Sequence, residues 1–278
     1  MQPRSTYIQL NFHEVHYTEW GSSNAPPLIL WHGLSRTGRD FDDIAQALSD
    51  TYRVICPDTI GRGLSQWSAR PDVEYCFAEY AKLALALLDA LSLGRVRWVG
   101  TSMGGALGIA AGATTLRGRI SHFVSNDMGP NLPPGPFERI KTYVGNPPDF
   151  ATMVELETYY RTIYVPFGAH TDAQWRRMAE TGMRRLANGR ITPHYDPALV
   201  RQLVNFPGDF EQWDAYDALD MKMLVLRGAA SDLLLPDVAL AMTTRGPRAR
   251  IVEIPFCGHA PGLNVADQIA IVRDFLAT

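Results

Sequence analysis

A serine stands between two glycines at the junction of two apolar segments, in the run Gly100-Thr101-Ser102-Met103-Gly104. The residues before it, 95–99, are rich in β-branched and aromatic side chains and predict a buried strand. The residues after it, 105–111, are small and apolar and predict a tightly packed helix. A serine at such a strand-to-helix corner is typical of a nucleophile elbow, in which backbone strain presents the hydroxyl at the start of the helix. Ser102 is therefore the candidate nucleophile.

A serine hydroxyl needs a nearby base to take its proton, and a histidine suits this task because its ordinary pKa lies near neutrality. Of the seven histidines, His259 lies between the last predicted strand and the final predicted helix, in Cys257-Gly258-His259-Ala260-Pro261. His122 lies inside a predicted strand and is expected to be packed. His259 is the predicted base.

The third member of such a triad orients the imidazole and stabilises its charged form. Two aspartates follow predicted strands at positions where this role is possible, Asp127 and Asp232. We favour Asp232, which follows the predicted strand 223–226. There it keeps the chain order serine, aspartate, histidine, with each residue at the strand end where folds with a nucleophile elbow carry it. Asp127 stays the alternative, with a loop-capping role as its other interpretation.

Two backbone amides are expected to stabilise the oxyanion that forms when the serine attacks a carbonyl. We assign one to Met103, at the start of the elbow helix, and the other to Leu34, in the loop after Leu30-Trp31-His32-Gly33. His32 is expected to hold that loop rather than to act as a second base. The segment 58–65, with its two glycines, predicts a tight structural turn beside it.

The elements that must position these residues alternate between strands and helices, which indicates an α/β protein with a mostly parallel sheet. Residues 7–10 and 15–20 predict an edge strand pair. Buried strands are predicted at 28–31, 54–56 and 95–99, and further strands at 120–124, 223–226 and 250–254. Helices are predicted at 40–48, 75–91 and 265–276.

The alternation of predicted strands and helices ends after Asp127. Four prolines crowd residues 130–136, and no convincing buried strand follows until about Asp217, so we expect this stretch to be helical. Apolar residues recur at helical spacing at Trp175, Met178, Ala179, Gly182 and Leu186. We therefore divide the chain into a core, 1–127 with 217–278, and an inserted segment, 128–216, called the cap segment below.

Taken together, these motifs resemble those of the α/β-hydrolase family. The resemblance is carried by His32-Gly33, by Asp58-Thr59-Ile60-Gly61-Arg62-Gly63-Leu64-Ser65, by Gly100-Thr101-Ser102-Met103-Gly104-Gly105, by Ser231-Asp232 and by Gly258-His259. It implies the fold of that family, acylation of Ser102 with His259 as base and Asp232 as the orienting acid, and release of the product by water. The serine argues against the haloalkane dehalogenases and epoxide hydrolases of this family, which use an aspartate nucleophile.

The cap segment resembles the helical cap that roofs the pocket in this family. Its aromatic residues are candidates for a pocket wall or for the core of the cap itself. We expect Tyr143, Tyr159, Tyr164 and Phe167 to line the substrate pocket, with Trp31, Leu34 and Met103 on its floor near Ser102. Such an apolar pocket suits a neutral ester.

The composition narrows the class of protein further. A formal net charge of −3 without a long run of one sign indicates neither a nucleic-acid partner nor a membrane partner. The N-terminus lacks the apolar core of a signal peptide, and no stretch is long and apolar enough for a membrane span. The cysteines Cys56, Cys76 and Cys257 show neither metal-ligand spacing nor a disulfide framework. We expect a cytoplasmic protein without cofactor or metal.

These observations favour a serine esterase or lactonase acting on a small, largely apolar ester or lactone, with water as the second reactant. The resemblance also leaves open a carbon–carbon bond hydrolase or a cofactor-free perhydrolase. A hypothesis of another class is a small-molecule receptor, or a non-catalytic binding protein, on the same scaffold.

Overall fold

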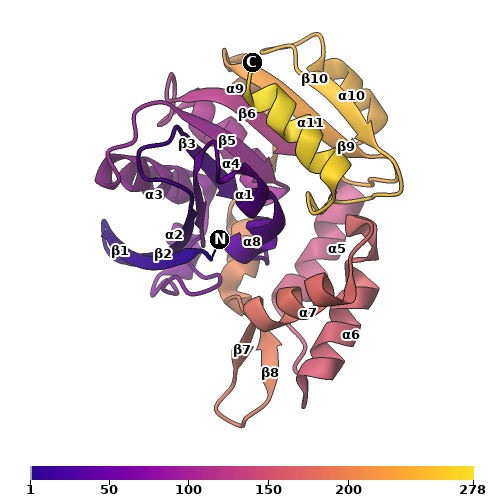
Figure 1. Ribbon diagram of the computed structural model, residues 1–278. Helices are drawn as coiled ribbons and strands as arrows, with labels where there is room; N and C mark the ends of the chain where they lie inside the picture. The colour runs from indigo at the N-terminus through magenta and orange to yellow at the C-terminus, as the bar shows by residue number, and fades with distance from the viewer. Residues whose placement is uncertain (1) are drawn as a thin grey trace.

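In the computed structural model, which describes residues 2–278, eight strands form one mixed sheet (Figure 1). Their order across the sheet is β1-β2-β4-β3-β5-β6-β9-β10. Only the β1–β2 and β2–β4 pairs are antiparallel, and the remaining neighbours run parallel. The strands are β1 (Arg4–Leu10), β2 (His13–Trp20), β3 (Pro27–Trp31), β4 (Arg53–Pro57), β5 (Val96–Thr101), β6 (Ile120–Asn126), β9 (Lys222–Gly228) and β10 (Arg250–Ile254). The predicted edge pair and the six further predicted strands are confirmed, and β10, at the other edge of the sheet, is only partly buried.

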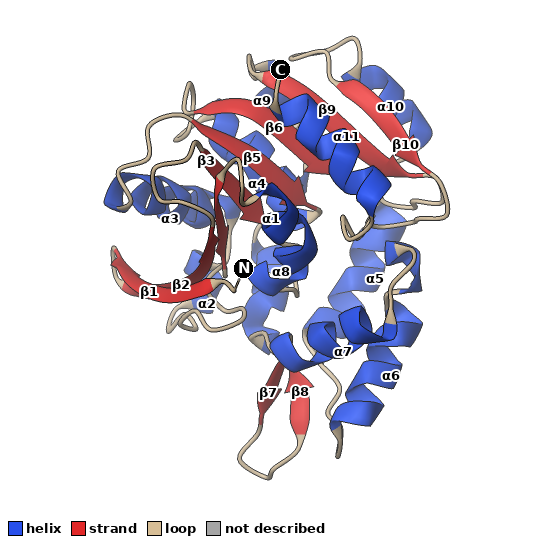
Figure 2. Ribbon diagram, in the orientation of Figure 1, coloured by secondary structure: helices blue, strands red, loops and turns tan. Residues whose placement is uncertain are grey.

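Helices cover both faces of this sheet because its parallel strands are apolar on both sides (Figure 2). Leu28 and Leu30 face the helices α1 (Asp42–Leu48) and α11 (Ala266–Leu276). The alternating residues Ile29 and Trp31 face the opposite layer, made by α3 (Phe77–Ala90), α4 (Met103–Ala113), α9 (Trp213–Asp217) and α10 (Pro236–Met242). This confirms the predicted α/β fold class.

Apart from α9 at its C-terminal end, which packs in the core, the cap segment lies mostly beyond the end of the sheet, in the lower part of Figure 1. It holds α5 (Pro134–Val144), α6 (Met153–Ile163), α7 (Asp172–Thr181) and α8 (Val200–Asn205). Leu156 and Tyr160 of α6 pack with Trp175 and Met178 of α7 in a small apolar cluster of their own. The remaining short helices of the chain are α2 (Pro71–Glu74) and the 3₁₀ turns η1 (Gly38–Phe41), η2 (Val165–Phe167), η3 (Pro197–Leu199) and η4 (Pro207–Phe210).

The expectation of a purely helical cap segment is wrong in one place. Residues 183–193 form a hairpin of β7 (Met183–Arg185) and β8 (Ile191–Pro193), so Leu186 lies beyond the end of α7. The turn contains Asn188-Gly189, with Gly189 at φ +83°, and the Leu186 amide donates to the Arg190 carbonyl at 2.8 Å. An Asn-Gly turn is a strong hairpin signal, which the helical spacing of the apolar residues obscured.

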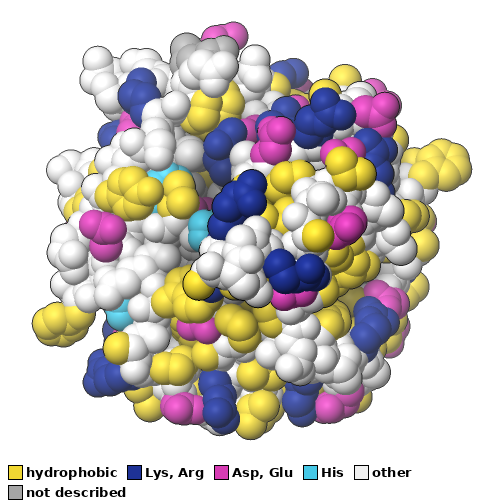
Figure 3. All heavy atoms as spheres, turned by 90° about the horizontal axis from the view of Figure 1, so that it is seen from below, with side chains coloured by type: hydrophobic (Ala, Val, Ile, Leu, Met, Phe, Trp, Pro, Cys, Tyr) yellow, Lys and Arg dark blue, Asp and Glu magenta, His cyan; other side chains and the backbone are white. Residues whose placement is uncertain are grey.

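The cysteines and the surface charges are arranged as the sequence led us to expect. All three cysteines are buried and free. On the face shown in Figure 3, basic and acidic side chains are interspersed rather than gathered by sign. Within residues 2–278, no helix combines the length and the apolar character that crossing a bilayer requires.

Candidate active site

Ser102 lies at the corner between β5 and α4, and its backbone adopts the strained conformation expected of an elbow. Its φ is +53° and its ψ is −116°, a region that L-residues rarely occupy. Glycines permit the sharp turn. A Cβ on Gly100 would lie 2.1 Å from the Gly104 carbonyl oxygen, and one on Gly104 would lie 2.0 Å from the Trp31 carbonyl oxygen. The sequence-predicted corner is therefore present, and both glycines are required by close backbone contact.

Replacing Gly104 with alanine should prevent the elbow from closing, because the added methyl group meets backbone that cannot move independently of β3. We expect a loss of several kcal/mol of stability, or no folded protein, measured by urea unfolding. Gly94→Ala is the matched control, since a Cβ there has nothing within 4 Å and should leave the unfolding midpoint nearly unchanged. Similar midpoints for both variants would contradict this account of the corner.

A continuous line of hydrogen bonds joins the serine to a histidine and an aspartate. The Ser102 Oγ lies 2.7 Å from His259 Nε2, and His259 Nδ1 lies 2.7 Å from Asp127 Oδ2. His259 comes from the loop between β10 and α11, and Asp127 directly follows β6. Nδ1–H can donate to the carboxylate while Nε2 accepts the serine proton, which is the tautomer that a general base requires. The structure thus brings together Ser102 and His259, as the sequence predicted.

The carboxylate next to His259 is Asp127, so the assignment of Asp232 to this position is wrong. Asp127 is fully buried, and its Oδ1 also accepts the Gly228 amide at 2.8 Å. Asp232 lies in the loop after β9 with its side chain about half exposed, 2.6 Å from Arg139 of α5. Strands β6 and β9 are neighbours, so both aspartates emerge at the same edge of the sheet. Position along the chain could not distinguish them.

The residue that the loop after β9 does contribute is Ser231, which the sequence analysis noted only as the neighbour of Asp232. Its hydroxyl donates to Asp127 Oδ2 at 2.6 Å and accepts the Leu234 amide at 3.1 Å. With Gly228 and His259, it gives the buried Asp127 carboxylate three donors. These three hydrogen bonds fix the orientation of the carboxylate that holds the His259 ring.

The amides of Leu34 and Met103 are free to bind an oxyanion. Neither donates a hydrogen bond to another of residues 2–278. A Cβ placed on Gly33 would lie 3.6 Å from Ser102 Cβ, so the Leu34 loop lies directly against the serine. Met103 is the first residue of α4, where aligned amides favour negative charge.

The carbonyl groups of the two peptide units that contain these amides each accept hydrogen bonds. The Gly33 carbonyl, in the same peptide unit as the Leu34 amide, lies 2.7 Å from His32 Nδ1 and accepts the Arg36 amide at 3.2 Å. The Ser102 carbonyl, in the same unit as the Met103 amide, accepts the Gly105 and Ala106 amides at 2.8 and 3.0 Å. Hydrogen bonds at a carbonyl strengthen the N–H of the same unit as a donor.

His32 holds its loop as a neutral imidazole, in keeping with the structural role expected of it. The Thr59 amide donates to Nε2 at 2.9 Å, which leaves the proton on Nδ1 for the Gly33 carbonyl. Complete burial lowers the pKa of His32 to about 4, against an ordinary value of 6.5. At neutral pH this histidine therefore carries no charge.

This pKa has a consequence for stability. Between about pH 6.5 and pH 4 the unfolded chain binds a proton on His32 that the folded chain does not, so the free energy of unfolding falls as the pH falls. The stability lost through this residue is about 3 kcal/mol across the window. Urea unfolding of the wild type and of His32→Gln should show the difference between them shrinking by this amount on acidification. A difference independent of pH would contradict the assignment.

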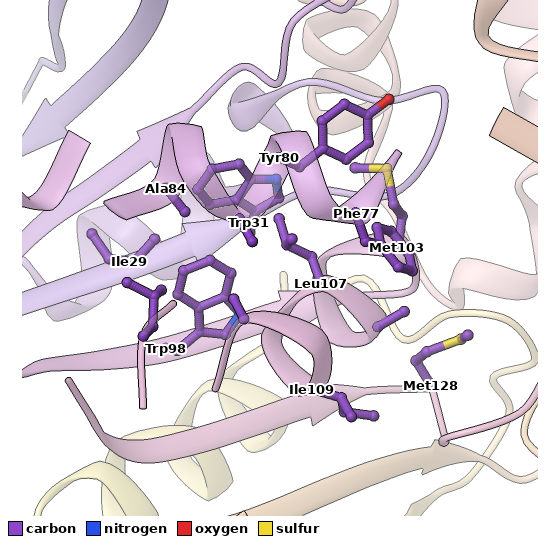
Figure 4. Close-up of a cluster of buried hydrophobic side chains, with 14 of the residues drawn as sticks. Ile29, Trp31, Phe77, Tyr80, Ala84, Trp98, Met103, Leu107, Ile109 and Met128 are labelled. Atoms are coloured by element: carbon purple, nitrogen blue, oxygen red, sulfur yellow. The ribbon is translucent and has the colours of Figure 1, made fainter. Parts of the chain in front are cut away.

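A cavity of about 750 Å³ opens above the Ser102–His259 pair. Its walls include Leu34 and the four cap aromatics expected there, Tyr143, Tyr159, Tyr164 and Phe167. Trp31 is not part of the wall, and that prediction is wrong. Its indole stacks on Trp98 at 5.1 Å in the core and donates to Thr59 Oγ1 at 2.9 Å (Figure 4). As the last residue of β3, it points to the same face of the sheet as Ile29.

Met103 is likewise not part of the wall, and this prediction is also wrong, because its side chain is buried in the core beside Tyr80 (Figure 4). Arg36 is one of several wall residues that were not predicted from the sequence. Its guanidinium makes two hydrogen bonds to Asp40, at 2.7 and 2.6 Å, and lies 5.1 and 4.6 Å from the ring centroids of Tyr160 and Tyr164. The loop that carries Leu34 is thereby attached to α6 of the cap segment. No short motif in the sequence signals this contact.

The fold and this site define a class of protein. Residues 28–271 match the family model described as the alpha/beta hydrolase family. The chain belongs to this family and has its fold.

Three relatives show how far the similarity extends. The chain is 38% identical to 3-hydroxybutyrate-oligomer hydrolase of Cupriavidus necator, over 98% of this chain and 97% of that protein. It is 25% identical to 2-(acetamidomethylene)succinate hydrolase of Mesorhizobium japonicum, over 85% of this chain and 82% of that one. The crystal structure of an alpha/beta hydrolase from Novosphingobium aromaticivorans matches with a TM-score of 0.88 and 32% identity, over 99% and 98% of the two chains.

Proposed function

We propose that the protein is a serine hydrolase that cleaves esters of short hydroxy acids through an acyl-enzyme on Ser102. The observation that carries this proposal is the line of hydrogen bonds from Asp127 through His259 to Ser102 at the base of a cavity. The substrate class is suggested by the relative from Cupriavidus necator, whose name states that it hydrolyses 3-hydroxybutyrate oligomers. A cavity of about 750 Å³ has room for several such units.

The short distances between Ser102, His259 and Asp127 allow the serine to be acylated as follows. Ser102 Oγ attacks the ester carbonyl carbon while its proton passes to His259 Nε2, 2.7 Å away. The carbonyl electron pair moves onto oxygen, and the Leu34 and Met103 amides stabilise that oxyanion. Asp127 accepts the Nδ1–H hydrogen bond and so stabilises the imidazolium.

The tetrahedral intermediate then collapses, and the alkoxide leaves with the proton from His259. Water repeats the sequence on the acyl-enzyme: His259 takes its proton, the acid is released, and Ser102 regains its hydrogen. The cap segment is assigned no reacting group. Its tyrosines form a wall with apolar rings and polar hydroxyls, which suits the methyl branches and ester oxygens of a hydroxybutyrate chain.

The test compares substrates of four kinds on one preparation: hydroxybutyrate dimer and trimer, an aryl butyrate, a lactone and a ring-cleavage diketone. We expect the oligomers to be cleaved with a kcat/KM at least about 100-fold above those for the lactone and the diketone. Ser102→Ala is the control and should turn over none of them. Preference for the diketone would indicate a carbon–carbon bond hydrolase. Tight ligand binding without turnover of any ester would indicate a receptor.

A further inference from the structure

Arg62 is a charged residue without a role in the mechanism above, and its side chain is completely buried. Its guanidinium reaches both residues whose amides face the serine. Nε donates to the Leu34 carbonyl at 2.8 Å, and Nη2 lies 3.3 Å from the Met103 sulfur. Nη1 donates to the Ile60 carbonyl at 2.9 Å and to the Tyr80 hydroxyl at 2.7 Å. One side chain thus contacts both halves of the oxyanion site.

The positive charge of Arg62 has only neutral hydrogen-bond partners among the described residues. It lies 5.0 Å from the centroid of the Tyr80 ring, and burial raises the pKa of Tyr80 to about 12, so this tyrosine stays uncharged at neutral pH. Nearby carboxylates are engaged elsewhere. Asp58 pairs with His16 at 2.8 Å, and Asp196 accepts the Tyr75 hydroxyl at 2.7 Å. A buried guanidinium without a carboxylate is costly, which indicates a use for its charge.

The backbone of Arg62 is fixed in a way that directs the side chain inward. Arg62 lies between Gly61, whose φ is +80°, and Gly63, whose φ is +51°. The Gly63 amide donates to the His194 carbonyl at 2.9 Å, and the Asp196 amide donates to the Gly61 carbonyl at 2.8 Å. The turn is therefore held from the cap segment, and Arg62 is not free to swing into solvent.

We propose that Arg62 is a positioning residue of the oxyanion hole, which fixes Leu34 relative to Met103 and supplies a buried positive charge behind them. This inference rests on the proposed function. When Ser102 Oγ bonds to the carbonyl carbon, negative charge develops on the oxygen in front of the two amides. The guanidinium lies roughly 6–9 Å behind that oxygen, given the hydrogen bonds that link them. The guanidinium attracts the full negative charge that develops on this oxygen during the attack. The attraction therefore stabilises the transition state more than the bound ester.

Loss of this charge should lower kcat and leave KM nearly unchanged. We expect Arg62→Gln and Arg62→Met to lower kcat for an aryl butyrate by about tenfold to a hundredfold, with KM within about twofold. Tyr80→Phe is the matched control, because it removes a hydroxyl bonded to the same guanidinium but leaves the charge in place. It should retain most of the wild-type kcat.

The distinguishing measurement uses a carbon-13-labelled trifluoromethyl ketone. Ser102 adds to its carbonyl, the serine proton passes to His259, and a hemiketal oxyanion forms in the site. The carbon-13 shift of this adduct reports the pKa of the hemiketal hydroxyl. We expect that pKa to rise by about one to two units in Arg62→Gln, in step with the loss in kcat, and to stay unchanged in Tyr80→Phe.

A folded Arg62→Gln or Arg62→Met protein with the wild-type hemiketal pKa and kcat would overturn the proposal. If neither variant folds, Arg62→Lys serves instead. Lysine keeps the charge but cannot reach Leu34 and Met103 together, so kcat should still fall by about fivefold or more at unchanged KM. A wild-type kcat in Arg62→Lys would also overturn it. Failure of the wild type to form the ketone adduct would instead count against the serine-hydrolase function itself.

Discussion

Ser102→Ala should lower the turnover of a hydroxybutyrate ester by roughly 10⁶-fold and abolish labelling by a fluorophosphonate. Alanine at this corner keeps the backbone and the cavity but removes the Oγ atom that lies 2.7 Å from His259 Nε2 and carries out the attack. Hydrolysis in a continuous assay and mass spectrometry of the labelled protein measure the two effects.

The control is Ser35→Ala, which removes the other serine hydroxyl among the described residues that line the cavity. This variant should still take up one phosphonate label. Persistent labelling of Ser102→Ala, or loss of labelling in Ser35→Ala alone, would place the nucleophile elsewhere.

Asp127→Asn should be the second most damaging change, with a loss of about 10⁴ in kcat. An amide at this position can no longer hold His259 with its proton on Nδ1 or balance the imidazolium. The variant should fold, since the asparagine oxygen can still accept the Gly228 amide while its NH₂ group donates to the Ser231 hydroxyl. Asp232→Asn is the matched control, with the same chemical change one strand away. It disturbs only a half-exposed ion pair with Arg139, worth at most about 1 kcal/mol, and kcat should change by less than about threefold.

The reverse outcome, an active Asp127→Asn and an inactive Asp232→Asn, would contradict the hydrogen bonds around His259. Circular dichroism and urea unfolding of both variants separate a catalytic loss from a folding loss. Equal, modest losses in both would indicate that neither carboxylate orients the histidine.

The strands and the elbow could be predicted from the sequence because their causes are local. Runs such as 28–31 and 223–226 are apolar on both faces, and the glycines beside Ser102 are required by contacts within the corner itself. The hairpin at 183–193 has a local signal too, in Asn188-Gly189, but the apolar spacing around it matched a helix equally well.

The triad acid and the cavity wall depend on contacts between distant segments, which a single sequence does not carry. Asp127 and Asp232 both follow strands that end at the same edge of the sheet, and only the loop conformations decide which carboxylate reaches His259. The burial of Arg62 and the stacking of Arg36 on α6 are likewise products of packing. Trp31 could have been assigned correctly, since the alternation of side chains along β3 turns it toward the core.

Two neighbouring strands carry aspartates with different roles. Asp127, after β6, contacts His259, whereas Asp232, after β9, contacts the cap segment. His259 is oriented by Asp127, whose carboxylate is held by the Ser231 hydroxyl, and this hydroxyl in turn accepts the Leu233 and Leu234 amides. The Asp232 side chain borders the cavity and pairs with Arg139 instead. Asp232 can therefore be exchanged together with its cap partner Arg139 to alter which substrates enter, with little effect on the chemistry. The Asp232–Arg139 pair is thus the place to change selectivity, whereas Asp127 and Ser231 should be kept.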